Sequence, residues 1–358
     1  MKNLVIDTRI IKNNLQTVKN KAGNASIYAD LSGDAFGLGL LRTAKLLRDE
    51  GIRNFVVSDP KDAKTLRDNG FYDERIMMLR STADAHEIAE LLDLNVICTV
   101  GSYDAAVAIN GIAESRRNVC EVQIKIDTGL GRYGFSPEET EKIASIYKYM
   151  TSLAVVGIFS TFSDSWKSRK RTEAQLTKFM GVLEKLHKMG YETGPAHICD
   201  SAALFKYNFG KLDAIRIGEA LSGRIPGKSI KGIGRVGYIE AGIEEVGWFP
   251  KGHRAGGGKP LKNAAKLAVI AVGYYHGYGV VRPEEDKTIF DTMRNRRRRL
   301  YVRIGKQKAK VVGQVGMMHT IIDVTKIDCT VGDVVKMDVD PVNVKGMGRV
   351  YETMTKQM

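Results

Sequence analysis

The first two thirds of the chain alternate short apolar runs with longer amphipathic segments. A short continuous apolar run is typical of a strand buried on both faces, and apolar residues spaced by three and four are typical of a helix with one buried face. The predicted strands cover residues 26–31, 54–57, 76–79, 95–99, 122–126, 154–159, 195–199 and 214–217. The predicted helices cover residues 40–50, 60–69, 83–92, 102–114, 137–148, 171–189 and 201–207.

Eight strands that alternate with helices predict a parallel sheet closed into a TIM-like (β/α)8 barrel. After Arg235 the pattern changes to period-two alternation, which predicts a smaller all-β domain. Its predicted strands cover residues 267–272, 299–304, 308–315, 320–324 and 333–337, with a loop at 253–260. We therefore expect an α/β barrel over residues 1–236 and a C-terminal β-domain over 237–358, with which the first few residues could pair.

Composition agrees with an ordered protein of two domains. The chain has 358 residues, of which 43% are hydrophobic. It does not start with an apolar leader, and it contains no uncharged apolar run of about 18 residues, so we expect a cytoplasmic protein without a membrane partner. Four widely spaced cysteines predict reduced thiols rather than disulfides or a zinc site: Cys98, Cys120, Cys199 and Cys329.

The formal net charge of +14 raises the question of an acidic partner. Basic residues cluster at 167–171, at Lys206 and Lys211, and at 294–299. Because aromatic residues do not alternate with these basic residues, no nucleic-acid module is recognisable. We expect solvated basic faces and no nucleic-acid partner, with RNA or an anionic surface as the alternative.

Several motifs stand in a fixed order along the chain. They are ADLSGDAFGLG at 29–39, KIDTGLGRYG at 125–134, DSAA at 200–203, RIGEALSG at 216–223, VGYYHGY at 272–278 and VGQVGMMH at 312–319. Together they resemble the motifs of alanine racemases, which are fold-type III enzymes that use pyridoxal phosphate (PLP). The resemblance implies a barrel followed by a β-domain. It also implies a homodimer with sites at the interface between barrel and β-domain, and a small amino-acid-like ligand.

One position departs from this family pattern. In alanine racemases the first motif carries the lysine that holds PLP, and this chain has Ser32 there. A hydroxyl cannot form a Schiff base, so the covalent anchor and one of the two bases for racemisation are lost. The other base, a tyrosine, is retained as Tyr274. We therefore expect no cofactor, or PLP held only non-covalently or through another lysine.

Other positions matched to the PLP site are retained or changed. The resemblance places Arg216 at the pyridine nitrogen and Ser201 at the phosphate. Phe36, Thr161 and Ser222 replace polar groups of the family, and Asp200 replaces an asparagine. The candidate site consists of Tyr274 and Asp200 as catalytic groups, with Asp30, Ser32, Phe36, Arg132, Thr161, Ser201, Arg216, Gly218 and Met317 as pocket residues.

Charge and strand alternation add detail to this site. Asp30 lies two residues before Ser32, so both side chains should point into the barrel. A buried aspartate needs a partner, and Arg132 or another cation in the barrel is expected to supply it. We also expect barrel carboxylates to hold Arg132 and Arg216. The spacing of Asp127, His276 and His319 fits no known metal site, so no metal is expected.

Three functions remain open from the sequence. The first is a racemase-like protein with a dismantled PLP site, which acts as a pseudoenzyme or binds a small ligand. The second is a PLP-independent enzyme that uses Asp30, Asp200, Tyr274 and Arg216. The third is a divergent PLP-dependent racemase.

Overall fold

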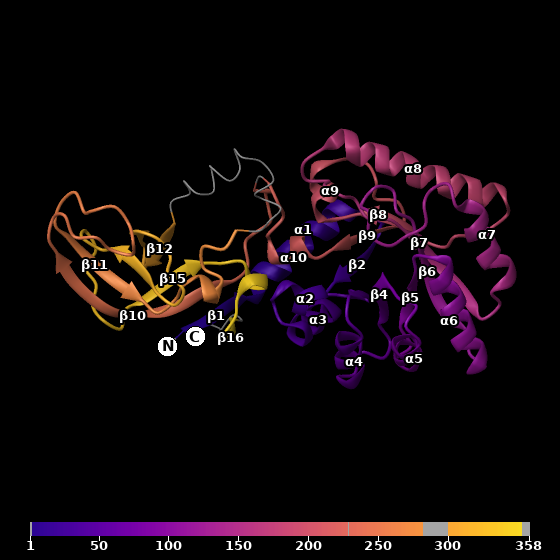
Figure 1. The fold of residues 1–358 in the computed structure, drawn as a ribbon, viewed down its shortest axis with the longest axis horizontal. Coiled ribbons are helices and arrows are strands. Elements are labelled where there is room, and N and C mark those ends of the chain that lie inside the picture. The colour runs from indigo at the N-terminus through magenta and orange to yellow at the C-terminus, as the bar shows by residue number, and fades with distance from the viewer. Residues whose placement is uncertain (1, 228, 282–299, 353–358) are drawn as a thin grey trace. The chain divides into compact units, whose positions relative to one another are not determined.

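The computed structural model describes residues 2–227, 229–281 and 300–352. The chain divides into two compact units, which are Lys12–Ile233 and the combination of Met1–Ile11 with Gly234–Met358 (Figure 1). The predicted domain boundary at residue 236 lies close to the end of the larger unit at Ile233. The arginine-rich cluster at 294–299 lies outside the described residues.

The larger unit is a closed barrel of eight parallel strands, which confirms the predicted fold. Each strand pairs with the next along the chain, and β9 pairs with β2 to close the barrel. The strands are β2 (Ser26–Asp30), β3 (Asn54–Val57), β4 (Arg75–Ser81), β5 (Ile97–Val100), β6 (Cys120–Lys125), β7 (Leu153–Phe159), β8 (Ala196–Cys199) and β9 (Ala214–Ile217).

Helices follow the strands and surround the barrel (Figure 1). Several of the helices have a side-chain cap, whose oxygen accepts a backbone N–H group of the first turn. The capping residues include Asp59, Asp84, Ser102 and Ser168. Because Asp84 is a cap, the helix predicted from residue 83 begins at Ala85. The helices are α1 (Thr8–Ala22), α3 (Leu40–Asp49), α4 (Pro60–Asp68), α5 (Ala85–Asp93), α6 (Tyr103–Ser115), α7 (Thr140–Tyr149), α8 (Arg169–Lys188), α9 (Ser201–Lys206) and the short α10 (Glu219–Ser222).

The barrel lumen is a packed core rather than a channel. Strands on all sides contribute buried side chains to one cluster, which contains Tyr28, Val56, Met77, Ile97, Phe159 and Ala214. In (β/α)8 barrels the carboxyl ends of the strands carry the functional residues.

The smaller unit is an eight-stranded sheet, which confirms the predicted all-β domain. The N-terminal strand β1 pairs antiparallel with β10 and parallel with β16. The strands are β1 (Lys2–Asp7), β10 (Tyr238–Phe249), β11 (Ala265–Ile270), β12 (Tyr301–Ile304), β13 (Gln307–Val311), β14 (Thr320–Asp323), β15 (Val334–Asp338) and β16 (Gly348–Glu352). No helix within the described ranges combines the length and apolar character needed to cross a membrane.

Candidate functional site

The turn after β2 has an unusual backbone. The segment α2 (Ser32–Phe36) is a left-handed turn, in which Asp34, Ala35 and Phe36 have φ values of 59°, 55° and 56°. This conformation costs about 1–2 kcal/mol per non-glycine residue. Such strain persists only where the surrounding structure holds it, and it concentrates at functional sites. The turn therefore marks the end of β2 as a candidate site.

Ser32 begins this turn, and its hydroxyl already has a partner. Its Oγ lies 2.6 Å from Ser58 Oγ, just after β3, and its backbone N–H donates to Asp30 Oδ1 at 2.9 Å. The residue is half-buried. Position 32 therefore offers a hydroxyl for hydrogen bonding and no amine.

Asp30 is desolvated but not ion-paired. Burial raises the pKa of Asp30, while the hydrogen bonds from Ser32 and the charges of Arg216 and Arg132 lower it. Across the described part of the chain, Asp30 has no arginine or lysine within salt-bridge distance. The expected ion pair with a barrel cation is therefore wrong, because the Ser32 N–H takes that place.

Arg216, on β9, is buried and has neutral partners. Its Nη1 lies 2.8 Å from His197 Nδ1, and its Nη2 donates to Ser160 O and Thr161 Oγ1, both at 2.9 Å. The expectation that barrel carboxylates hold this arginine is wrong. Burial lowers the pKa of Arg216, and the carboxylates of Asp30 and Asp200 raise it from a distance. Its positive charge has no direct counter-ion among these partners.

His197 connects Arg216 to the barrel core, and sequence reasoning did not find it. Because Nδ1 accepts from Arg216, Nε2 carries the proton and donates to Gln123 Oε1 at 2.8 Å. Gln123 Nε2 in turn donates to Tyr28 OH at 3.2 Å. The imidazole stacks with the rings of Tyr28 and Phe159. Burial and the charge of Arg216 hold the pKa of His197 well below its usual value.

Donor groups also gather where β9 leads into α10. Ser201 Oγ accepts from the backbone N–H groups of Gly218 and Ala220 at 3.3 and 3.2 Å. The Phe36 ring packs on Gly218 so closely that a Cβ there would lie 2.1 Å from a ring carbon. Ser222 is buried and donates to the carbonyl of Glu219 at 3.0 Å. The structure thus brings Phe36, Ser201 and Gly218 together.

Asp200 is a helix cap. Its Oδ1 accepts from Ala203 N–H at 2.7 Å, and the Ser165 hydroxyl donates to both of its carboxylate oxygens at 2.8 and 2.7 Å. Burial raises the pKa of Asp200, and these hydrogen bonds lower it. The carboxylate therefore stabilises the start of α9, which limits its freedom to act on a ligand.

Lys125, at the end of β6, is a second residue that sequence reasoning did not place in the site. It is 1% exposed, and its Nζ donates to Arg132 O at 2.9 Å. Burial, followed by the charges of Arg132 and Arg216, lowers the pKa of Lys125 to about 8. The side chain of Arg132 is exposed, and no carboxylate lies within ion-pair distance of it in the described residues.

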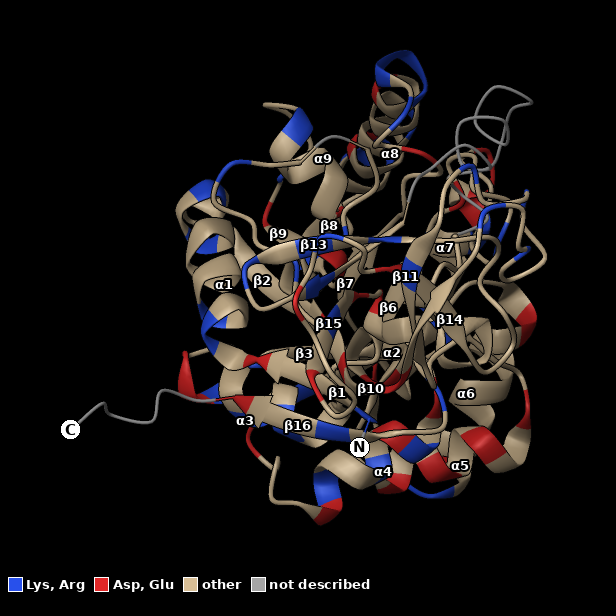
Figure 2. Ribbon diagram, turned by 90° about the vertical axis from the view of Figure 1, so that its left-hand side faces the viewer, with Lys and Arg blue, Asp and Glu red and all other residues tan. Residues whose placement is uncertain are grey.

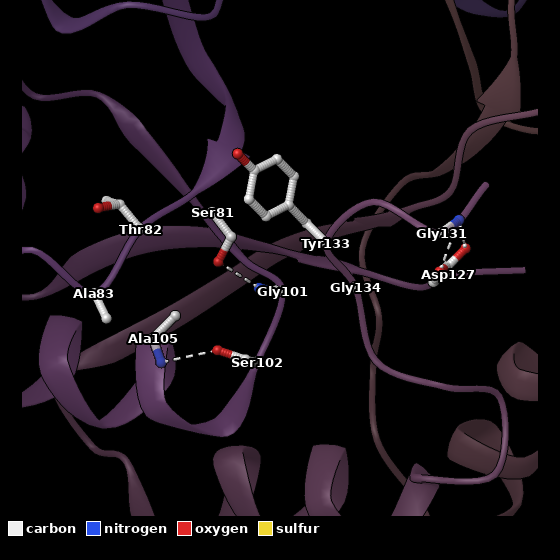
Figure 3. Close-up of a pocket in the computed structure, with 10 residues that line it drawn as sticks. All are labelled: Ser81, Thr82, Ala83, Gly101, Ser102, Ala105, Asp127, Gly131, Tyr133 and Gly134. Carbon is white, nitrogen blue, oxygen red and sulfur yellow. Dashed lines mark hydrogen bonds between the residues drawn. The ribbon is translucent and has the colours of Figure 1, made fainter. Parts of the chain in front are cut away.

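A cavity of about 380 Å³ opens beside these residues (Figure 3). Asp127 forms part of its wall, and its carboxylate accepts the backbone N–H groups of Gly129, Leu130 and Gly131. The other polar side chains that line it are Ser81, Thr82, Ser102 and Tyr133. Hydroxyl groups dominate this wall, so the cavity suits a small polar ligand.

The two remaining candidates belong to the β-unit. Tyr274 and Met317 come from turns held together by backbone bonds, since Tyr274 N–H donates to Gly316 O at 2.9 Å and Tyr275 N–H to Met317 O at 3.1 Å. Tyr274 and Met317 are 53% and 55% exposed. His276 is buried, with its Nε2 2.8 Å from Lys2 Nζ. Within the described residues, no three His, Cys, Asp or Glu side chains are grouped so that they could hold a metal ion.

Comparisons with known proteins give consistent matches. The family model "Alanine racemase, N-terminal domain" matches residues 6–226. An alanine racemase of Clostridium tetani is 31% identical over 343 residues, covering 92% of this chain and 83% of the relative. One of Borreliella burgdorferi is 27% identical over 336 residues, with coverage of 91% and 85%.

Solved structures show the same fold. The alanine racemase from D-cycloserine producing Streptomyces lavendulae superposes with a TM-score of 0.85 at 20% identity, covering 99% of this chain and 98% of that one. The alanine racemase of Clostridium difficile 630 gives a TM-score of 0.82 at 22% identity, with coverage of 98% and 95%.

These matches correct one expectation. The prediction that no cofactor is likely is wrong, because alanine racemases depend on PLP and the matches make PLP the expected cofactor here. The prediction gave too much weight to position 32. A covalent link is only one of the interactions that hold a cofactor, and the phosphate and ring have partners of their own.

Proposed function

This chain belongs to the alanine racemase family, and from that premise we propose that its barrel mouth binds PLP but does not racemise alanine by the family's route. The observation that carries the proposal is the hydrogen bond of 2.6 Å between the hydroxyls of Ser32 and Ser58. It occupies the position at which the family resemblance expects the cofactor lysine.

Several residues of the barrel mouth fit the body of the cofactor. The amides of Gly218 and Ala220 both donate to Ser201 Oγ, and backbone N–H groups gathered beside a hydroxyl are the kind of group that binds phosphate oxygens. The Phe36 ring supplies a flat apolar wall against Gly218. Arg216 adds a positive charge whose direct partners are neutral. When bound, PLP supplies an electron sink for charge that develops on a substrate carbon.

The residues of the barrel mouth do not fit a covalent link between residue 32 and PLP. A lysine amine can bond to the cofactor aldehyde and can also carry a proton to or from a substrate, whereas the Ser32 hydroxyl can do neither at neutral pH. Asp30, the nearest acid, already accepts the Ser32 N–H. Racemisation needs bases on both faces of the substrate, and this face lacks one.

Two acidic residues of the barrel mouth, Asp30 and Asp200, are expected to weaken the binding of PLP. Asp30 and Asp200 are half-buried, and desolvation raises the pKa of each. When they ionise, they repel a phosphate dianion in a partly desolvated site. We therefore expect the affinity for PLP to fall as the pH rises and these carboxyls lose their protons.

We also propose that the protein is a homodimer, as the family resemblance implies. A half-exposed tyrosine beside a half-exposed methionine, as at Tyr274 and Met317, is typical of a protein interface. Size-exclusion chromatography with light scattering measures the mass of the full-length protein, and a monomer at micromolar concentration would contradict this.

The cofactor proposal is tested with full-length protein and two matched variants. Equilibrium dialysis should show that the native protein binds PLP, and borohydride should then fix no pyridoxyl group to the peptide that contains Ser32. Ser32→Lys should allow borohydride to fix the group at residue 32, whereas Ser32→Ala should not. Interconversion of D- and L-alanine by the native protein, or no PLP bound at millimolar concentration, would overturn the proposal.

A further inference from the structure

The β-unit contains a groove of about 660 Å³ whose rim carries five lysines. They are Lys259, Lys262, Lys308, Lys310 and Lys326, and we call this feature the lysine groove. All five side chains are exposed. Apolar residues such as Val311 and Ile327 form part of its lining. In Figure 2, blue segments of the ribbon, which mark lysine and arginine, lie beside the label of β13.

The described residues leave the lysine charges of this groove without ion pairs. None of the five lysines forms an ion pair with another described residue. The one carboxylate in the lining, Asp323, instead accepts the N–H and hydroxyl of Thr325 at 3.0 and 2.6 Å. Elsewhere, lysines such as Lys64 and Lys188 pair with an acid one helical turn away. Unpaired like charges repel one another, so the groove favours an anionic ligand.

The sheet beside the groove adds an aromatic ring to these charges. On β12, Tyr301 and Arg303 are exposed while Val302 and Ile304 are buried. Tyr301 pairs in register with Lys310, and Arg303 pairs with Lys308. Residues directly opposite on adjacent strands project from the same face of the sheet. One exposed face therefore presents Tyr301, Arg303, Lys308 and Lys310 together, and it continues into the groove through the two lysines.

We propose that this face of the β-unit and the lysine groove bind single-stranded nucleic acid. The lysines contact successive phosphates, and the ring of Tyr301, which is 45% exposed, stacks on an unpaired base. Sites for single-stranded nucleic acid combine two elements, which are cations along the phosphate backbone and an exposed aromatic ring beside them. In a duplex the bases are stacked inside the helix, so none is free to stack on the ring of Tyr301. The sequence did not predict this site, because its lysines come from three separate segments of the chain.

The test is fluorescence anisotropy of the full-length protein with a labelled single-stranded RNA of about 12 nucleotides. Binding should weaken steeply between about 50 and about 200 mM salt. Lys308→Gln with Lys310→Gln should weaken binding about tenfold and reduce the log–log salt slope by about 1.4, which is the loss of two phosphate contacts on a single strand. The control, Lys45→Gln with Lys61→Gln, removes the same charge from exposed positions of the barrel unit and should change affinity by less than about twofold.

The aromatic contact is tested separately. Tyr301→Leu should weaken binding about fivefold without changing the salt slope, and Tyr301→Phe should retain the native affinity because it keeps the ring. Circular dichroism confirms that each variant is folded. The proposal is overturned if no RNA binds at low salt, if the control pair weakens binding as much as the groove pair, or if duplex DNA or inorganic polyphosphate competes as well as single strands. Equal binding of single-stranded DNA supports it.

Discussion

Arg216 donates to His197 Nδ1 at 2.8 Å, and this bond fixes both the tautomer of the imidazole and the direction of the guanidinium. The proton on His197 Nε2 is then directed to Gln123, whose amide continues the chain to Tyr28. Every partner of Arg216 in this network is neutral. A buried arginine with no carboxylate among its direct partners is suited to an anionic ligand, which is consistent with the proposed PLP site.

His197→Leu should destabilise the protein by about 2–4 kcal/mol, because it leaves buried Arg216 and Gln123 groups without a partner. Urea unfolding followed by circular dichroism measures the change in the free energy of unfolding. His86→Leu, at an exposed position, is the matched control and should change this free energy by less than about 0.5 kcal/mol. Similar losses for both variants would show that the network does not stabilise the fold.

The pKa of His197 predicts how stability depends on pH. The imidazole is neutral in the folded protein, where its pKa is well below the usual 6.5, and it takes up a proton in the unfolded chain below that pH. The unfolded state therefore binds more protons, and the free energy of unfolding falls as the pH falls below 6.5. Relative to His197→Leu, the native protein should lose stability from pH 7 to pH 5, and a pH-independent difference between them would count against a buried neutral histidine.

Asp30 is expected to change the free energy of unfolding with pH in the opposite direction to His197. Its pKa is raised above 3.8 in the folded protein by burial. Its contribution to stability is fully present below pH 3.8 and is lost as the pH rises through the folded pKa, because the unfolded chain ionises first. Asp30→Asn should therefore be more stable than the native protein at pH 7, by about 1 kcal/mol. Asp73→Asn, at an exposed site, is the control, and equal effects of the two substitutions would contradict this.

The contact between Phe36 and Gly218 can be measured by a double-mutant cycle. A Cβ at residue 218 would lie 2.1 Å from the Phe36 ring, so Gly218→Ala must displace the ring and should cost about 1–3 kcal/mol. In a Phe36→Ala background the same change should cost little, since the obstructing ring is gone. Chemical denaturation of the four proteins gives the coupling energy, which we expect at about 1–2 kcal/mol. A coupling near zero would mean that the turn after β2 adjusts freely.

The barrel was predictable because parallel strands are buried on both faces and appear in the sequence as continuous apolar runs. Two strands of the β-unit that follow residue 236 were missed for the opposite reason. β10 carries Glu240, Glu244 and Glu245 among its apolar residues, and β16 is largely exposed, so neither shows a clean period. Helix α1 was missed as well, since polar residues occupy its exposed side and Asn14 occupies a buried position.

The site was predictable only where a motif identified it. Phe36, Ser201 and Gly218 belong to motifs of the family, and the structure brings them together. His197 and Gln123 lie on strands far apart in the sequence, and only the closed barrel places their side chains in contact. Strand alternation could have marked them as inward-facing polar residues, but it could not have paired them.

Lys125 offers a last test of the barrel interior. The residue is 1% exposed, and its pKa is lowered to about 8 by burial and by Arg132 and Arg216. In the unfolded chain the usual pKa is 10.5, so between pH 8 and 10.5 the unfolded state binds more protons and stability rises with pH. Below pH 8 the buried charge destabilises the fold.

Lys125→Met removes this charge and retains most of the side-chain volume. The variant loses the hydrogen bond to Arg132 O but avoids the desolvated ammonium, and we expect it to be about 1 kcal/mol more stable than the native protein at pH 7. The difference should shrink as the pH rises toward 10, because the native amine becomes neutral. Urea unfolding at several pH values, with exposed Lys45→Met as the control, measures it. If the advantage of Lys125→Met stayed constant with pH, the native lysine would not carry a buried charge.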